Sequence, residues 1–106
     1  MQEIQIITTD EFEKWLRSIV DIRSRRKITL RIQRLKLGNF GDYKSIGKEI
    51  YELRIHFGPG YRIYFAKKGE LFVILLVGGD KSSQSKDITQ SQLLWQEIKN
   101  DDFEKL

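Results

Sequence analysis

The stretch from Gly47 to Lys81 constrains the fold most, because its apolar residues recur at every second position. They form two runs, Tyr51, Leu53, Ile55 and Phe57 and then, after Gly58-Pro59-Gly60, Tyr61, Ile63 and Phe65. A strand sends alternate side chains to opposite faces, so the pattern predicts an antiparallel hairpin with one apolar face. The opposite face carries Glu52, Arg54, His56, Arg62, Tyr64 and Ala66. This polar face is the candidate site.

A third strand follows the short Lys68-Gly69 turn. Residues Leu71 to Val77 are all apolar, which is typical of a central strand covered on both faces. Gly78-Gly79 is expected to break this strand and to deliver Lys81 at its exit.

In the N-terminal third, the apolar spacing and the capping residues predict a strand and two helices. Glu3 to Thr8 reads as a short strand at the edge of the meander. Thr9 or Asp10 then caps a helix that carries the apolar stripe Phe12, Trp15, Leu16 and Ile19. Asp21 caps a longer helix that runs to about Leu37 and ends at Gly38-Asn39. The two helices are expected to form a hairpin.

The longer helix carries more than one kind of surface. Ile28, Ile32 and Leu35 share one face, whereas Leu30 and Leu37 point away from it. The second stripe either meets the first helix or stays exposed to dock another protein. The same helix holds Arg23, Arg25, Arg26, Lys27, Arg31 and Arg34. These residues are either a solvated face or a track for phosphates.

The remaining segments are two loops and a helix. Residues Asn39 to Ser45 and Ser82 to Ser85 are predicted to be loops, and a last helix is predicted near Lys86 to Asn100. Its apolar side is expected to cover the free face of the third strand. Asp101 to Leu106 is expected to be a frayed tail.

Composition narrows the function. A chain of 106 residues is predicted to form one domain, residues 1–106. It has no cysteine and a single histidine, which argues against a disulfide, a metal site or any other cofactor. No stretch has the pattern of a membrane span or signal peptide, so a cytoplasmic protein without a membrane partner is expected. The net charge of +4 is compatible with a polyanionic partner and also with simple solubility.

The polar face suits a phosphodiester. Arg54, His56, Arg62 and Tyr64 are joined there by Lys81 at the strand exit and by Lys44 and Lys48 before the hairpin. Guanidinium groups bind phosphate oxygens and stabilise the extra charge of a pentacoordinate phosphorane. Tyr64 has the chemistry to stack on a base or donate a proton, and His56 that of a base. RNA supplies its own nucleophile, the 2′-OH, so no metal is required. Each residue taken alone also has an ordinary structural interpretation.

Four stretches carry a resemblance to a known family: EFEKWLRSIVD, RLKLGNFGDYKSIG, YELRIHFGPGYRIYF and LLVGGDKSSQSKDI. From about Glu11 to Leu94 the chain resembles the phage-derived addiction-module killer proteins of the RelE/ParE toxin superfamily, in the branch close to HigB. The resemblance implies an α+β fold, with an N-terminal strand and two-helix hairpin packed on an antiparallel meander sheet and a C-terminal helix. This agrees with the pattern above.

The resemblance also implies a function. It indicates the toxin of a type II toxin–antitoxin system, a ribosome-dependent mRNA endonuclease held inactive by a helix-turn-helix antitoxin that binds operator DNA. By position, Arg62 corresponds to the arginine at the scissile phosphate and Lys81 to a second basic residue, while Arg54 lies near a strand lysine. RelE has a catalytic tyrosine at the start of its last helix, where this chain reads SQSKDI. Asp87 or a relocated Tyr64 is left for that role, and the general acid and base stay unassigned.

The superfamily leaves other functions open. ParE-like members poison DNA gyrase without catalytic residues, so the fold does not choose between the two activities. Arg54, Arg62 and Lys81 on one concave face favour the nuclease. An inactive remnant that only binds antitoxin is the third alternative.

Overall fold

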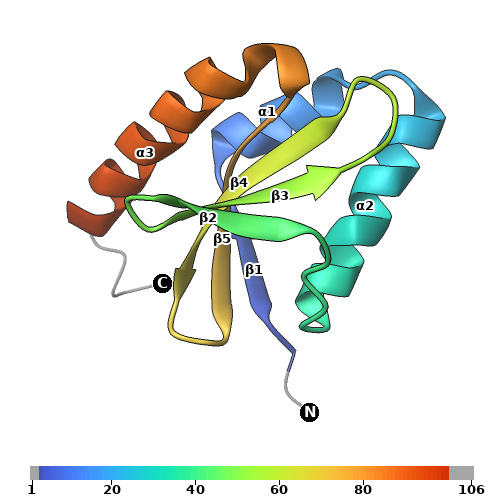
Figure 1. Ribbon diagram of the computed structural model, residues 1–106. Coiled ribbons are helices and arrows are strands. Elements are labelled where there is room, and N and C mark those ends of the chain that lie inside the picture. The colour runs from blue at the N-terminus through green and yellow to red at the C-terminus, as the bar shows by residue number, and fades with distance from the viewer. Residues whose placement is uncertain (1–2, 101–106) are drawn as a thin grey trace.

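A five-stranded sheet with helices on both faces forms the body of the molecule (Figure 1). The computed structural model describes residues 3–100, and the tail predicted at 101–106 lies outside them. The strand order is β1-β5-β4-β3-β2, with β1 parallel to β5 and all other pairs antiparallel. The predicted α+β fold is therefore confirmed, with β1 at one edge of the sheet.

The elements follow one another with short connections. They are β1 (Gln5–Thr8), α1 (Asp10–Ser18), α2 (Ile22–Lys36), β2 (Tyr43–Gly47), β3 (Ile50–Ile55), β4 (Tyr61–Lys68), β5 (Phe72–Asp80), a 3₁₀ turn η1 (Lys81–Ser83) and α3 (Gln84–Asn100). Both predicted caps are present, because Thr9 Oγ1 accepts from Phe12 N at 3.0 Å and Asp21 Oδ2 accepts from Ser24 N at 3.2 Å. No helix within residues 3–100 has the length and apolar character needed to cross a bilayer.

Each face of the sheet covers its own hydrophobic core. The alternating apolar residues of β3 and β4 pack with Phe12 of α1 and with Ile28 and Leu35 of α2. The other core lies beneath α3 and includes Ile50, Tyr64, Ala66, Ile74, Leu76 and Trp95. Figure 1 shows α3 on one side of the sheet and α1 and α2 on the other. As predicted, β5 lies inside the sheet and is covered on both faces.

A β-bulge shifts the register between β4 and β5. Tyr64 pairs with Val77, but the next residue, Phe65, pairs with Leu75, so Leu76 is the extra residue. Leu76 and Val77 therefore both belong to the core under α3. Beyond the bulge, Arg62 lies opposite Gly79.

The loop predicted at residues 39–45 is wrong in its second half, because β2 begins at Tyr43. This strand forms a hairpin with β3 in which Gly47 pairs with Ile50. The two turn residues, Lys48 and Glu49, both have positive φ, as a type I′ turn requires. That turn normally contains Asn or Gly, so Lys-Glu gave no hairpin signal.

Gly78-Gly79 does not break the third strand, which continues to Asp80. Both glycines instead allow close packing from opposite faces. A Cβ on Gly78 would lie 2.1–2.4 Å from the Trp15 ring, and one on Gly79 would lie 1.8 Å from Asp87 Oδ2. The predicted loop at Ser82 to Ser85 is likewise the 3₁₀ turn and the first turn of α3.

The second apolar stripe of α2 is exposed. Leu30 is 44% exposed and Leu37 is 62% exposed, so neither is covered by α1 as the first alternative required. Ile22 at the start of the helix is 74% exposed. The outer surface of α2 thus presents apolar side chains among its basic ones.

The close packing of Gly78 gives a test of the fold. Gly78→Ala is expected to reduce the free energy of unfolding by about 1–3 kcal/mol, because the added methyl overlaps the indole of Trp15. Urea denaturation measures the change. Trp15→Leu makes room, so the double variant should lose less stability than the two single variants together. Additive losses would contradict this packing.

Candidate active site

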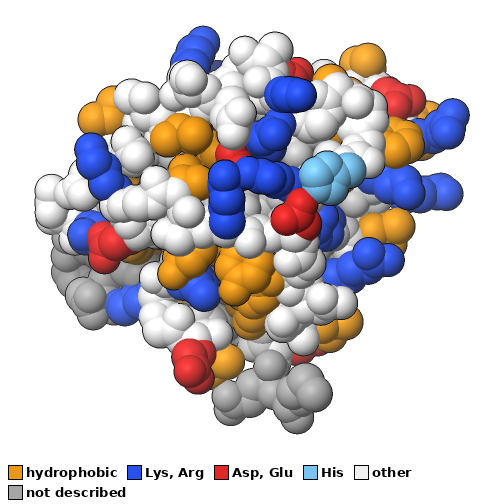
Figure 2. Space-filling model, in the orientation of Figure 1, with side chains coloured by type: hydrophobic (Ala, Val, Ile, Leu, Met, Phe, Trp, Pro, Cys, Tyr) orange, Lys and Arg blue, Asp and Glu red, His pale blue; other side chains and the backbone are white. Residues whose placement is uncertain are grey.

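A concave surface of about 460 Å³ lies where the β3–β4 hairpin meets the start of η1. It is lined by Arg54, His56, Arg62 and Lys81, by Ile55, Phe57 and Tyr61, and by the turn Gly58-Pro59-Gly60. Figure 2 shows basic side chains gathered beside the histidine on this face. The pocket therefore combines three permanent cations and the chain's one imidazole.

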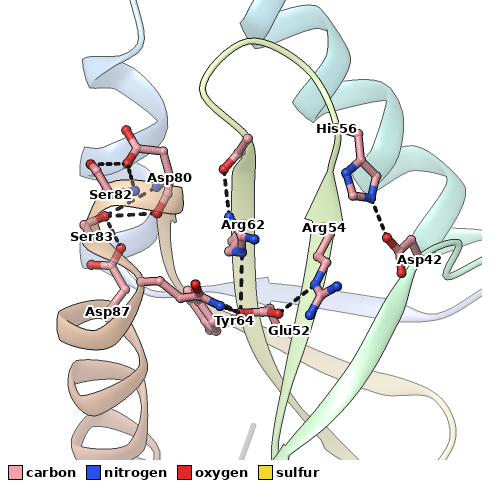
Figure 3. Close-up of polar contacts among 12 residues, drawn as sticks. Asp42, Glu52, Arg54, His56, Arg62, Tyr64, Asp80, Ser82, Ser83 and Asp87 are labelled. Atoms are coloured by element: carbon pink, nitrogen blue, oxygen red, sulfur yellow. Dashed lines mark hydrogen bonds and ion pairs between the residues drawn. The ribbon is translucent and has the colours of Figure 1, made fainter.

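A buried carboxylate, that of Glu52, lies beneath the two arginines (Figure 3). Arg54 Nε donates to Glu52 Oε1 at 3.0 Å, and Arg62 Nε is 3.6 Å from Oε2. Oε2 also accepts from the Tyr64 hydroxyl at 3.2 Å and from Gln84 Nε2 at 2.8 Å. Residues from β3, β4 and α3 thus converge on one side chain.

These contacts determine the ionisation of Glu52 and Tyr64. Burial opposes ionisation of Glu52, but hydrogen bonds from Arg54, Gln84 and Tyr64 outweigh it and hold the pKa of this carboxyl below its ordinary value. Burial and the nearby Glu52 charge raise the pKa of the Tyr64 phenol. Tyr64 is fully buried and is therefore a neutral donor to Glu52, out of reach of a base that would stack on it.

Arg62 has the longer contact with Glu52 of the two arginines. Its Nη1 donates to the Gly60 carbonyl at 3.3 Å, while its buried Nε has no hydrogen-bond acceptor among the described residues. Arg54 has the tighter bond to Glu52, which raises the pKa of its guanidinium. Because the unbonded Nε is buried beside Glu52, only the terminal guanidinium nitrogens of Arg62 are left to bind an oxyanion in the pocket.

His56 belongs to a second polar pair. Its Nε2 lies 2.5 Å from Asp42 Oδ2, and this hydrogen bond holds the pKa of the Asp42 carboxyl below its ordinary range. Both side chains are exposed. The pair leaves one edge of the imidazole fixed by a carboxylate at the rim of the pocket.

Arg31 of α2 fixes the segment that carries Asp42. Its Nη1 donates to the carbonyl of Arg54 at 2.6 Å, and its Nη2 donates to the carbonyls of Phe40 and Asp42 at 3.2 and 3.0 Å. Burial lowers the pKa of Arg31. This arginine is therefore an internal clamp and belongs neither to a solvated face nor to a phosphate track.

Lys81 is positioned by the turn that precedes α3. Asp80 caps this turn through Ser82 N at 2.8 Å, and the Ser82 contacts lower the pKa of Asp80. Ser83 Oγ donates to the buried Asp87 carboxylate at 2.5 Å. Asp87 packs over Gly79 and does not line the pocket.

The structure brings together only part of the predicted site. Arg54, Arg62, His56 and Lys81 line the same pocket, whereas Tyr64 and Asp87 are buried next to it. Lys44 lies opposite Glu52 on the edge strand, and Lys48 lies in the β2–β3 turn. Neither of these lysines lines the pocket.

Sequence reasoning missed three residues that organise the site. The alternation along β3 places Glu52 on the polar face, but it does not reveal a site role, because the burial of Glu52 depends on α3. Asp42 and Arg31 are brought to the pocket by a loop and a helix distant in sequence. One signal in the sequence could have identified Glu52, which is the acidic residue on a strand face that also carries Arg54 and Arg62. Within residues 3–100 no cluster of three or more potential metal ligands is present.

Comparison with known proteins places the chain among phage-derived sequences. The family model described as "Phage derived protein Gp49-like" matches residues 14–94. An uncharacterized protein of Haemophilus influenzae is 53% identical over 95 residues, which cover 90% of this chain and 96% of that protein.

Solved structures share the fold at low sequence identity. A double arginine-to-alanine mutant of the E. coli toxin RelE in the free state has a TM-score of 0.67 at 14% identity, covering 86% of this chain and 95% of that one. A chain of the intact E. coli RelBE toxin–antitoxin complex has a TM-score of 0.58 at 15% identity, with coverage of 73% and 95%. The chain therefore has the fold of RelE.

The Arg31 clamp gives a test of the site's framework. Arg31→Ala is expected to reduce the free energy of unfolding by about 2 kcal/mol, because three carbonyl groups lose a charged donor. Thermal or urea unfolding measures this loss. Arg34→Ala, an exposed arginine on the same helix, should change stability by no more than about 0.5 kcal/mol. Equal effects at the two positions would show that Arg31 is not a clamp.

Proposed function

Because the chain belongs to the phage-derived Gp49-like family, we propose that it is the toxin of a toxin–antitoxin pair, and that it cleaves mRNA on the ribosome. The fold shared with RelE is compatible with this activity. The observation that carries the proposal is the convergence of Arg54, Arg62 and Lys81 on one pocket. The whole chain acts as a single toxin domain in the cytoplasm, where its mRNA substrate is translated.

The pocket suits metal-independent cleavage of RNA. The ribose 2′-OH attacks the adjacent phosphorus, the bond to O5′ breaks, and the products are a 2′,3′-cyclic phosphate and a 5′-OH. One proton leaves the 2′-OH and one is given to O5′. The guanidinium groups and the ammonium stabilise the additional negative charge of the phosphorane between these steps. No cofactor takes part.

Roles follow from position in the pocket. Arg62 binds the scissile phosphate through its terminal guanidinium nitrogens, and Arg54 and Lys81 bind its other oxygens. His56 is the side chain suited to accept the 2′-OH proton, since it lines the pocket and is oriented by Asp42. Tyr64 and Asp87 act indirectly because both are buried. Lys44 and Lys48 contact the RNA backbone outside the pocket.

A helix-turn-helix antitoxin is the expected protein partner, and it links the complex to operator DNA. The outer surface of α2 offers a place for it. Two adjoining hollows of about 400 and 420 Å³ there share Ile22, Arg26 and Leu30, and Phe57 lines both the second hollow and the catalytic pocket. Helix α2 contains no acidic residue, so an acidic partner segment with apolar side chains is complementary to it.

The cleavage proposal is tested at Arg62. Arg62→Ala is expected to lower mRNA cleavage in a translation extract at least about 100-fold, because a phosphorane contact is lost. Toeprinting or primer extension measures the cut, and circular dichroism checks the fold. Arg17→Ala, an exposed arginine on α1, is the matched control and should cleave normally.

Two results would overturn the nuclease proposal. Cleavage that survives Arg62→Ala in a folded protein would remove the assigned role of the pocket. Intact mRNA with the native chain, accompanied by trapped cleaved plasmid, would indicate a gyrase poison instead.

The antitoxin surface has a separate test. Leu30→Asp is expected to weaken binding of the small helix-turn-helix protein from the neighbouring reading frame by about tenfold or more, since a charge enters an apolar contact. Calorimetry and rescue of growth by co-expression measure binding. Leu93→Asp on α3, at a leucine that is 64% exposed, should bind normally. Binding indifferent to Leu30→Asp would exclude α2 as the docking surface.

A further inference from the structure

We propose that Glu52 is a positioning residue of the RNA-cleaving pocket: it fixes Arg54 and Arg62 in one orientation without contacting the substrate. The proposal deepens the function proposed above and rests on it for its catalytic consequence. Glu52 is fully buried and does not line the pocket, so it reaches the substrate only through the arginines.

The arginines need such a group because they face each other. Arg54 and Arg62 are directly paired across β3 and β4, which places their side chains on the same face of the sheet. Like charges in this position repel and would splay into solvent. Glu52 lies two residues before Arg54 on β3 and bonds one guanidinium at 3.0 Å and approaches the other at 3.6 Å. A single carboxylate thus holds both cations together.

Neutral donors fix the carboxylate itself. The Tyr64 hydroxyl from β4 and the Gln84 amide from α3 both donate to Glu52 Oε2. These contacts involve three elements, so the position of Glu52 is set by the packing of α3 on the sheet and not by β3 alone. Because Glu52 is held in place by these donors, its contacts with Arg54 and Arg62 fix the positions of the two guanidinium groups (Figure 3).

The buried anion alone does not neutralise the pocket. Glu52 carries one negative charge beneath Arg54 and Arg62, Lys81 is a third cation, and Asp42 and Asp80 lie close enough to act on Arg54 and Arg62. A phosphodiester carries one negative charge and the phosphorane carries two. Complete neutralisation of the arginines would abolish phosphate binding, whereas removal of Glu52 would add net positive charge but lose the fixed geometry.

A substitution of Glu52 can distinguish two roles: fixing the orientation of the arginines, and lowering the positive charge of the pocket. Glu52→Gln keeps the shape of the side chain, can still accept from one arginine, and raises the local charge by one. If Glu52 only reduced the pocket's attraction for RNA, the variant would bind more tightly and cleave at least as fast. If it positions the arginines, the variant binds equally well or better and cleaves more slowly.

Single-turnover cleavage on programmed ribosomes, with the toxin in excess, measures both quantities. For Glu52→Gln we expect the limiting rate to fall about 100-fold and the half-saturating toxin concentration to stay within about threefold of the native value or to decrease. Gln84→Ala removes only one support of Glu52 and should show a smaller loss of rate in a stable protein. Glu49→Gln is the matched control, since Glu49 bonds Trp95 and Lys99 away from the pocket.

A second measurement does not depend on cleavage. The Nε–Hε groups of Arg54 and Arg62 give NMR signals whose order parameters report how firmly each guanidinium is held. Glu52→Gln and Gln84→Ala are expected to lower these order parameters for both arginines. As with the cleavage rate, the decrease should be larger for Glu52→Gln than for Gln84→Ala. Glu49→Gln should leave them unchanged.

The outcomes distinguish this inference from the proposed function. Native cleavage with an inactive Arg62→Ala variant, but with unchanged rate and unchanged arginine order in Glu52→Gln, would overturn the positioning role alone. Absence of native cleavage would overturn the nuclease, while the NMR measurement would still decide whether Glu52 holds the arginines. A Glu52→Gln variant that loses rate only in proportion to its unfolded fraction would show a structural role and contradict the inference.

Discussion

The ionic contact of Glu52 with two arginines is the interaction on which the site depends. Two guanidinium groups on directly paired residues of neighbouring strands repel each other, and a buried carboxylate alone is expensive to desolvate. Together, and with Tyr64 and Gln84 as further donors to the carboxylate, the groups give Glu52 its hydrogen bonds and each guanidinium an ionic partner. The polar face of the hairpin can therefore be concave, cationic and ordered at the same time.

The rest of the fold makes this arrangement possible. The bulge at Leu76 brings Gly79 opposite Arg62, and the absence of a side chain there leaves room for Asp87 at the start of α3. Helix α3 covers the apolar half of the same sheet face. Its first residue, Gln84, donates to the Glu52 carboxylate. On the other face, α1 and α2 cover the main core, and Arg31 ties α2 to the loop that carries Asp42. The pocket lies where these constraints meet.

The sequence predicted the elements with strong local signals. The period-two hairpin, the all-apolar β5 and the caps at Thr9 and Asp21 each rest on residues close in the chain. The RelE-like α+β fold was implied by the family resemblance, and these patterns agree with it. β2 was missed because Lys48 and Glu49 adopt positive φ without the glycine or asparagine that usually marks such a turn. Gly78-Gly79 predicts the end of β5, but the strand continues to Asp80, because the two glycines serve close packing there.

The site was only partly predictable for a different reason. Alternation along two strands places Arg54 and Arg62 on one face, but the burial of Tyr64 and Asp87 depends on how α3 packs against the sheet. Local pattern also gives no hint that Arg31 turns inward while its basic neighbours on α2 face solvent. Such contacts between distant segments decide which of several basic residues belong to the pocket.

Attack of the 2′-OH on the adjacent phosphorus is the chemistry that we propose for this pocket. The most direct measurement is the chemistry of the RNA ends that appear when the native chain is induced in growing cells. We expect upstream fragments that end in a 2′,3′-cyclic phosphate and downstream fragments that begin with a 5′-OH, cut within translated codons. Transcripts that stay whole, or fragments that begin with a 5′-phosphate, would contradict this proposal.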